Sequence, residues 1–180
     1  MAKTLVISGH PSLNDESIAN RAIISKLKTA PNVSVRDIKA LYPDFKIDVE
    51  AEQKALLEAD NVVFQFPFFW YSVPGILKEW MDEVLTYGFA HGSTGTKLHG
   101  KRLIISTTTG APEIAYTTEN DDTFKIELLL KHMEQSAKMT GMKYEALVSY
   151  DVGYIPGIRG DKDDIAKRAE EHAEKLLQML

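Results

Sequence analysis

Short apolar runs alternate with longer amphipathic stretches along the whole chain. The apolar runs are rich in Val, Ile, Leu and Phe, and they lie at residues 4–8, 33–38, 61–66, 101–107 and 143–150. Runs of this length and composition predict β-strands. In the run 33–38 apolar and polar residues alternate, which predicts a strand nearer to an edge of the sheet.

The stretches between the strands predict helices. One begins near Ser17, one follows Asp48 as N-cap, one follows Pro74, and two more cover residues 124–140 and 165–180. The helix after Pro74 has the clearest pattern, with a core-facing stripe of Leu77, Trp80, Met81, Val84 and Leu85. In the stretch 124–140 the inward positions are predicted to be Leu128, Leu129 and Met133, with Gly141 ending the helix.

Strands that alternate with helices indicate an α/β protein whose parallel sheet is covered on both faces. The 180 residues contain no internal repeat and no linker rich in Pro, Gly or Ser, so we expect one domain over residues 1–180. Periodicity alone leaves the order of the strands open.

Composition removes several classes of function. The formal net charge of −5 and the lack of a long basic run argue against a nucleic-acid-binding surface. With no cysteine, disulfides, thiolate catalysis and cysteine-ligated metals are excluded. The apolar run at the N-terminus is too short for a signal peptide or a membrane span, so we expect a cytoplasmic protein.

The segment 64–74 is the most informative part of the chain. A buried strand ends at Pro67, a helix starts at Pro74, and the connection holds four bulky aromatics, Phe68, Phe69, Trp70 and Tyr71. Four consecutive bulky side chains cannot all point inward, so at least one should face a cleft or another subunit. Because the ligands of open α/β sheets bind at the carboxyl ends of the strands, this loop suggests a flat, partly apolar ligand.

Two other loops should leave from the same edge of a parallel sheet. Residues 9–17 precede a helix whose free N–H groups favour an anion, and His10, Ser17 and Asn20 can add donors. The alternative is an ordinary turn with Ser17 as N-cap. The third loop offers the hydroxyls of Thr108 and Thr109 and the open backbone of Gly110, or else it is a simple polar strand end.

Other signatures of known sites are absent from the sequence. No GxGxxG follows a strand, and neither GxxxxGK[ST] nor GxSxG occurs. No two histidines have the helical spacing of metal ligands, so a metal site is not expected. Four of the histidines are most simply solvated, namely His91, His99, His132 and His172.

The chain resembles a known family in these same segments. The segment from Ala59 to Pro67 and the segment from Trp70 to Trp80 are the most specific, and Gly9-His10-Pro11 and Thr108-Thr109-Gly110 follow the same order. These residues resemble the flavodoxin-like NAD(P)H:quinone oxidoreductases of the DT-diaphorase type. The family's short bacterial members include modulator-of-drug-activity proteins and ancillary proteins of potassium efflux systems. The resemblance implies a flavodoxin-like three-layer sandwich with strand order 2-1-3-4-5.

The resemblance also implies a flavin in the crevice at the sheet's edge. His10, Ser17, Ile18 and Asn20 would hold the phosphate and ribityl chain, Pro67, Phe68, Phe69, Trp70 and Tyr71 would flank the ring, and Thr108, Thr109 and Gly110 would contact its other edge. The resemblance implies Tyr116 as the catalytic residue, because it matches a family tyrosine near the flavin, whereas Asp122 stands where animal members have a histidine. The chain is shorter than those members at its C-terminus, where they bind adenine, so FMN is at least as well supported as FAD.

The activity implied is a two-electron transfer from NAD(P)H to a quinone or a similar acceptor, with Phe69, Trp70 and Tyr116 lining the substrate pocket. The family's pocket lies at a dimer interface, and the aromatics at 68–71 and 87–89 fit a homodimer. The alternatives are a flavin-containing ancillary subunit of a potassium efflux transporter and a one-electron flavodoxin carrier. Neither the acceptor nor the choice between NADH and NADPH follows from the sequence.

Overall fold

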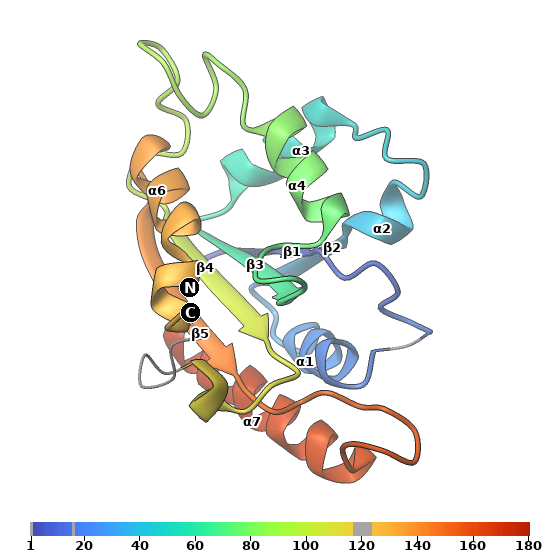
Figure 1. Cartoon of the computed structure of the whole chain (residues 1–180). Helices are drawn as coiled ribbons and strands as arrows, with labels where there is room; N and C mark the ends of the chain where they lie inside the picture. Colours follow the sequence, from blue (N-terminus) through green and yellow to red (C-terminus); the bar gives the residue numbers. More distant parts are fainter. Residues whose placement is uncertain (1, 16, 117–123) are drawn as a thin grey trace.

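The computed structural model describes residues 2–15, 17–116 and 124–180, and helices lie on both faces of its single five-stranded sheet (Figure 1). The strands are β1 (Thr4–Ser8), β2 (Val33–Asp37), β3 (Asn61–Pro67), β4 (Arg102–Thr108) and β5 (Lys143–Ser149). All neighbours pair in parallel, in the order β2-β1-β3-β4-β5. The predicted strands are confirmed to within one residue at each end, as is the order that the resemblance implied.

The helices form two layers around the sheet. One face is covered by α2 (Ile38–Leu41), α3 (Val49–Glu58), α4 (Gly75–Val84), α5 (Ile126–Leu129) and α6 (Lys131–Met139). The other face is covered by α1 (Ala19–Leu27) and α7 (Lys162–Met179), which pack together. Within the described ranges, none of these helices combines the length and the apolar composition that a bilayer span requires.

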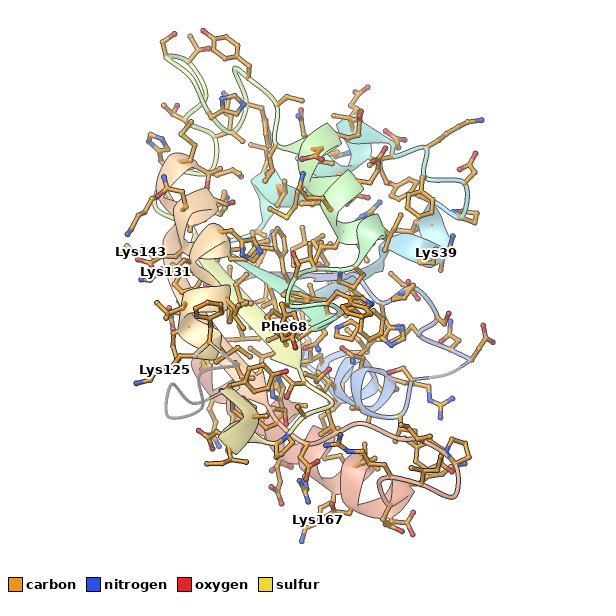
Figure 2. The ribbon with its side chains drawn as sticks, viewed as in Figure 1. Lys39, Phe68, Lys125, Lys131, Lys143 and Lys167 are labelled. Carbon is orange, nitrogen blue, oxygen red and sulfur yellow. The ribbon has the colours of Figure 1, made fainter. Side chains whose placement is uncertain are left out.

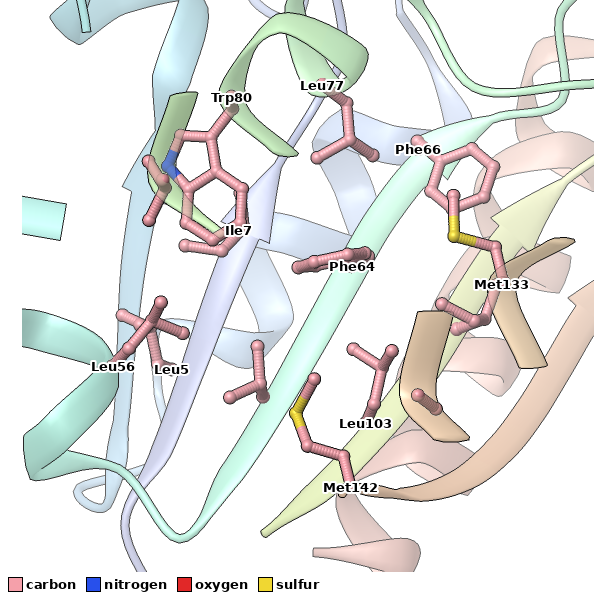
Figure 3. Close-up of a cluster of buried hydrophobic side chains, with 14 of the residues drawn as sticks. Leu5, Ile7, Leu56, Phe64, Phe66, Leu77, Trp80, Leu103, Met133 and Met142 are labelled. Atoms are coloured by element: carbon pink, nitrogen blue, oxygen red, sulfur yellow. The ribbon is translucent and has the colours of Figure 1, made fainter. Parts of the chain in front are cut away.

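The buried strands supply a core on each side of the sheet. Because side chains alternate along a strand, Ile7, Phe64 and Ile105 face α3 and α4, while Val6, Val63 and Ile104 face α1 and α7. Figure 3 shows the first of these cores, in which the rings of Phe64 and Trp80 meet edge to face at 5.5 Å. Burying each of these large side chains contributes about 1.5–3 kcal/mol.

Local signals set several helix ends as predicted. The side chain of Asp48 accepts the N–H of Ala51 at 3.0 Å and so caps α3. Gly141 follows α6 with φ +70°, a left-handed conformation that a glycine adopts without strain, and its N–H donates to Lys138 O. A short helix that the pattern did not predict, α2, begins at Ile38 and is capped by Asp37, whose carboxylate accepts the N–H of Ala40.

Two helix predictions were wrong in detail. The stretch 124–140 is broken at Leu130 into α5 and α6, and Leu128 is 51% exposed rather than inward. The buried stripe is Ile126, Leu130, Met133 and Ala137, with Leu129 half-buried beside it, so the inward position of Met133 is confirmed and only Leu128 was misplaced. The last helix starts at Lys162, three residues before the predicted start, because Asp161 accepts the N–H groups of Asp163 and Asp164.

Candidate functional site

The three predicted loops meet at the carboxyl edge of the sheet. The rings of His10 and Phe69 are 6.1 Å apart, which joins the first loop to the aromatic loop. The N–H of Phe68 donates to Thr108 O at 2.8 Å, which joins the aromatic loop to the third loop. We call this region, formed by residues 9–15, 17–20, 67–73 and 108–116, the carboxyl-edge site. In Figure 2 the labelled Phe68 lies near the end of β3, while the labelled lysines lie around the outside.

The first loop is held tightly against helix α4. A Cβ on Gly9 would lie 2.8 Å from the Cβ of Leu77, so only glycine fits where the chain leaves β1. At the other end of the loop, Ser17 Oγ accepts the backbone N–H of Asn20 at 3.1 Å. Ser17 therefore caps the start of α1, as the alternative interpretation predicted, although the regular helix begins only at Ala19.

Three side chains of the site each accept one hydrogen bond from an N–H group of the protein. His10 Nδ1 accepts from the N–H of Ser12 at 3.0 Å, Ser17 Oγ accepts from Asn20, and Thr108 Oγ1 accepts from Asn20 Nδ2 at 2.9 Å. Burial lowers the pKa of His10 to about 4, so the ring is neutral at pH 7 and its hydrogen is on Nε2. Within the described ranges, His10 Nε2, Ser17 Oγ and Thr108 Oγ1 donate no hydrogen bond, so their hydrogens can serve a bound group. The site can thus donate to a phosphate or other oxygen-rich ligand.

The aromatic loop is mostly outside the core. Phe68 is 8% exposed, but Trp70 is 93% exposed, and Phe69 and Tyr71 are also exposed, as the surplus of aromatics predicted. Trp70 and Tyr71 both have positive φ, at 50° and 61°, and the N–H of Ser72 donates to Phe69 O across the turn. Such a turn usually contains Asn or Gly, and each bulky residue there costs about 1–3 kcal/mol. Backbone strain of this kind is concentrated at binding and active sites.

A hollow of about 500 Å³ lies beside the aromatic loop. Phe69 and Trp70 line it together with Phe45 and Lys39, whose ammonium group is 4.8 Å from the centre of the Phe45 ring. The sequence analysis did not include Phe45 or Lys39, because they come from the segment after β2. No local pattern indicated that this segment reaches the loop after β3.

Tyr116, the predicted catalytic residue, lies in the 3₁₀ helix η1 (Glu113–Tyr116) beside the aromatic loop. Its ring centroid is 6.3 Å from that of Phe68 and 5.8 Å from that of Tyr150. Burial raises the pKa of Tyr116 and raises that of Tyr150 to about 12, so both phenols keep their hydrogens at neutral pH. Tyr150 was missed by the sequence analysis, although it directly follows the fifth strand. Asp122 lies outside the described residues.

The loop after β5 supports the third loop of the site. The N–H of Val152 donates to Thr109 O and that of Asp151 donates to Ala111 O, each at 3.0 Å. A Cβ on Gly153 would lie 3.0 Å from the Cα of Gly110, so the two backbones approach as closely as glycines allow. Gly110 itself is exposed, and the backbone on either side of it is held by Asp151 and Val152 of the loop after β5.

Behind the site, a chain of buried polar side chains runs from Thr108 to helix α7. Asn20 Oδ1 accepts from Gln65 Nε2 at 2.8 Å, Gln65 Oε1 accepts from Ser106 Oγ at 2.6 Å, and Ser106 Oγ lies 2.6 Å from His172 Nε2. His172 is 3% exposed, so the prediction that it is solvated was wrong. It belongs to the buried stripe of α7, formed by Ile165, Ala169, His172, Ala173 and Leu176. That helical spacing was the signal that could have located it.

Comparison with known proteins supports a family assignment. Residues 2–180 match the family Flavodoxin_2, described as having a flavodoxin-like fold. The chain is 39% identical over 175 residues to the uncharacterized NAD(P)H oxidoreductase YrkL of Bacillus subtilis, covering 97% of each chain. It is also 39% identical over 173 residues to the glutathione-regulated potassium-efflux system ancillary protein KefF of Salmonella dublin, covering 96% of this chain and 94% of KefF.

Solved structures agree in fold over nearly the full length. General stress protein 14 of Treponema denticola, in complex with FMN, aligns with a TM-score of 0.87 at 29% identity, covering 99% of each chain. An NADPH-quinone reductase from P. pentosaceus aligns with a TM-score of 0.80 at 29% identity, covering 96% of each chain. With the strand order, the three converging loops and a match over residues 2–180, the chain belongs to the Flavodoxin_2 family of flavodoxin-like proteins.

Proposed function

We propose that this protein is an NAD(P)H oxidoreductase that binds FMN at the carboxyl-edge site and passes two electrons to a quinone or a similar acceptor. The observation that carries the proposal is the set of donors at His10, Ser17 and Thr108, placed beside an exposed aromatic loop. A flavin mononucleotide needs both features, because it joins a charged phosphate to a flat aromatic ring. The relatives named as oxidoreductases and the FMN complex of a neighbour support the same assignment.

The phosphate and ribityl chain would lie against the first loop. There the N-terminus of α1 favours an anion, and Ser17, Ile18 and Asn20 form the start of that helix. The neutral ring of His10 would donate from Nε2 without adding a positive charge. FMN needs no site for an adenine, and a neighbouring structure contains FMN, so it is proposed ahead of FAD.

The flavin ring would lie between the aromatic loop and the third loop. Pro67, Phe68, Phe69, Trp70 and Tyr71 would flank it on one side, and the hydroxyl of Thr108 with the backbone of Thr109 and Gly110 would meet its edge. When bound, the flavin supplies the redox chemistry, accepting a hydride from the nicotinamide and returning two electrons to the acceptor. The residues orient the ring, exclude water with aromatic surface and present donors to its polar edge.

Tyr116 is the proposed proton-holding residue of the pocket. Its phenol keeps its hydrogen, since burial raises its pKa, and its ring is wedged between Phe68 and Tyr150. It can therefore donate a hydrogen bond where negative charge develops during reduction. Phe69 and Trp70 would form the opposite wall, against which the nicotinamide and the acceptor bind in turn.

Purified protein provides the test of this proposal. The protein is denatured, the released flavin is identified, and the oxidation of NADH and NADPH is followed with a soluble quinone as acceptor. We expect the protein to be yellow and to release FMN on denaturation. We expect it to oxidise many equivalents of NADH or NADPH only when quinone is present in excess. A colourless protein that takes up no flavin from solution would rule the proposal out. Reduction of the flavin without turnover of the quinone would indicate an electron carrier instead.

A second candidate function has support from one relative. The chain is as similar to KefF as to YrkL, at 39% identity, and KefF is named as an ancillary protein of a potassium-efflux system. The chain could therefore bind a membrane transporter and keep its reductase activity. Deletion of the gene should then reduce potassium efflux, and reintroduction of the wild-type chain should restore it. If efflux is unchanged by the deletion, this candidate fails.

We also propose that the protein forms a homodimer that completes the substrate pocket. Phe69, Trp70 and Tyr71 leave a large aromatic surface beside the carboxyl-edge site, and Tyr87 is 70% exposed. Aromatic surface of this kind is typical of interfaces. The mass of the protein in solution, measured by light scattering, should be twice that of the chain, and Trp70→Asp should lower it to that of a monomer.

A further inference from the structure

Three members of the buried polar chain behind the carboxyl-edge site, Gln65, Ser106 and His172, have no function in the mechanism above. This polar chain contains Thr108, Asn20, Gln65, Ser106 and His172, each at most 4% exposed. Consecutive members are 2.6–2.9 Å apart, so every link is a strong hydrogen bond. The chain lies on the face of the sheet that α1 and α7 cover. It links β3 with β4 and connects α1 with α7. It thus joins the ligand side of the sheet's edge to a histidine that the proposed ligand does not touch.

The links of this chain have a common direction. Ser106 has one hydroxyl hydrogen and donates it to Gln65 Oε1, so its oxygen accepts from His172 Nε2–H. Gln65 Nε2 donates to Asn20 Oδ1, and Asn20 Nδ2 donates to Thr108 Oγ1. Thr108 then has its own hydrogen available for a bound group. With His172 as the Nε2–H tautomer, Thr108 is a donor toward the site.

The same side chains are equally well satisfied with every bond reversed. If His172 carries its hydrogen on Nδ1, then Nε2 accepts from Ser106 Oγ, and Ser106 accepts from the rotated amide of Gln65. The Gln65 oxygen then accepts from Asn20, and the Asn20 oxygen accepts from Thr108 Oγ1–H. Thr108 has then used its hydrogen internally and offers a lone pair to a bound group. The two patterns differ only in hydrogen positions and two amide rotations.

His172 is the member that can select between the patterns. Burial lowers the pKa of His172 to about 4, with a smaller effect from Lys175, so the ring is neutral at pH 7 and has two tautomers. Beside it is a hollow of about 400 Å³ lined also by Glu113, Arg168, Glu171 and Lys175. Water or an exposed side chain in this hollow can exchange hydrogen with the ring, which Ser106 and Gln65, enclosed between sheet and helices, cannot do.

We propose that His172 is a positioning residue for the bound flavin, and that its tautomer sets the hydrogen-bonding role of Thr108 through Ser106, Gln65 and Asn20. This inference rests on the proposed FMN site. A flavin makes use of both roles, because reduction places hydrogen on a ring nitrogen that accepts hydrogen bonds when oxidised. A chain that can reverse its direction satisfies both forms of the cofactor without moving the backbone.

Nitrogen-15 NMR of the histidine rings is the direct test. The ring signals of wild-type protein are recorded without flavin, with FMN, and with FMN reduced by dithionite, and those of His172 are identified by their loss in His172→Gln. We expect the Nε2–H tautomer with oxidised FMN and a shift toward Nδ1–H when the FMN is reduced. The signals of exposed His132, which lies on α6, should not change. Identical His172 signals in all three states would overturn the inference.

Binding of FMN by variants gives an independent readout, measured by quenching of flavin fluorescence. Ser106→Ala and His172→Leu each remove one link, and we expect the Kd for FMN to rise about threefold to tenfold, the loss of one hydrogen bond. His172→Gln places an amide that can donate or accept, so its Kd should stay within about twofold of wild type. The matched control is Ser136→Ala on α6, whose hydroxyl donates only to His132 O.

The outcomes separate this inference from the proposed function. If wild type binds no FMN, the proposed function fails and this inference fails with it. If wild type binds FMN but Ser106→Ala and His172→Leu bind it equally well, the inference alone is overturned. If His172→Leu does not fold, the binding test relies on Ser106→Ala. That variant removes only one oxygen atom from the core, so we expect it to fold.

Discussion

Two buried polar networks lie on opposite faces of the same sheet. On the face of α3 and α4, Glu52 is fully buried and accepts from Arg36 and Tyr42 at 2.6 Å and from Trp80 Nε1 at 3.0 Å. On the face of α1 and α7, the neutral chain from Thr108 to His172 contains no ionised group at pH 7. One network is charged and the other is a chain of amides, hydroxyls and an imidazole.

The networks differ in where they end. Each oxygen of Glu52 has a partner inside the protein, and those partners tie β2, α3 and α4 together, so the charged network is closed. The neutral chain ends at Thr108, at the edge where the three loops meet, so it is open to a ligand. A buried charge is costly unless it is fully paired, which favours a closed network with a structural role. Neutral groups can change partners at low cost, which suits a network that contacts a ligand.

Removing the charge should break the closed network and give the largest effect on stability. In Glu52→Ala, Arg36, Tyr42 and Trp80 all lose their acceptor, and we expect the free energy of unfolding to fall by about 3 kcal/mol. The lower end of the usual range applies because the side chain of Arg36 is 26% exposed and can be hydrated. The measurement is urea denaturation, with Glu58→Ala on the exposed face of α3 as control.

In the same variant, the Kd for FMN of the folded protein should stay within about twofold of wild type. A large loss of flavin affinity in Glu52→Ala would contradict the division into a structural and a functional network.

Breaking the open network should affect both stability and binding. In Asn20→Ala, Gln65 Nε2 and Thr108 Oγ1 lose partners in a buried setting, and we expect a loss of about 2 kcal/mol in unfolding free energy. The Kd for FMN should rise at least tenfold, because Asn20 also lies at the proposed binding site. Denaturation and fluorescence titration measure the two effects. A stable variant with unchanged affinity would show that the chain does not serve the site.

The pH dependence of stability should distinguish the networks further. The pKa of His172 is about 4 when folded and about 6.5 in an unfolded chain. Between these values the unfolded chain binds a proton that the folded chain does not, so this contribution to stability is complete above pH 6.5 and falls as the pH falls toward 4. At pH 5.5 the loss should be about 1.4 kcal/mol.

His172→Gln should remove this part of the pH dependence. His10 has a similarly lowered pKa and remains in the variant, so the difference between the two denaturation curves isolates His172. Equal slopes for wild type and variant between pH 7 and pH 5 would mean that His172 is not buried in its neutral form.

The smallest effect should come from a charge that belongs to neither network. Asp82 forms an i,i+4 ion pair with Lys78 on the surface of α4, and both side chains are more than half exposed. Asp82→Ala should lower the unfolding free energy by about 0.3–0.5 kcal/mol, an effect that salt reduces further. A loss as large as that of Glu52→Ala would show that burial does not explain the difference between the networks.

Much of the fold could be predicted because its signals are local. The strands at 4–8 and 61–66 are continuous apolar runs, and the stripe of α4 from Leu77 to Leu85 needs only helical spacing. The cap at Asp48 and the glycine after α6 are also decided within a few residues. On α5 and α6 the inward position of Met133 was predicted correctly, but Leu128 was assigned to the core and Leu130 was missed, because several leucines in succession fit more than one helical face.

The candidate site was predicted in part for the same reason. His10, Ser17, Phe68 and Thr108 each lie at the end of a recognisable strand or the start of a helix, and a parallel sheet brings such ends together. Phe45, Tyr150 and His172 were missed. Phe45 comes from a segment with no signature of its own, whereas Tyr150 follows a predicted strand and His172 has the spacing of the buried stripe of α7. The role of each still depends on which distant residue it meets.

The sequence by itself determined the alternation of strands and helices, the exclusion of thiol chemistry and the three loops at one edge of the sheet, because these follow from residue type and spacing. Only the tertiary structure decided the partners of the buried polar groups. Gln65 and Ser106 lie 41 positions apart, and Ser106 and His172 lie 66 apart, and their hydrogen bonds exist only because β3, β4 and α7 pack side by side. Burial between these elements also keeps His172 neutral, since the pKa of a histidine depends on its surroundings rather than on its neighbours in sequence.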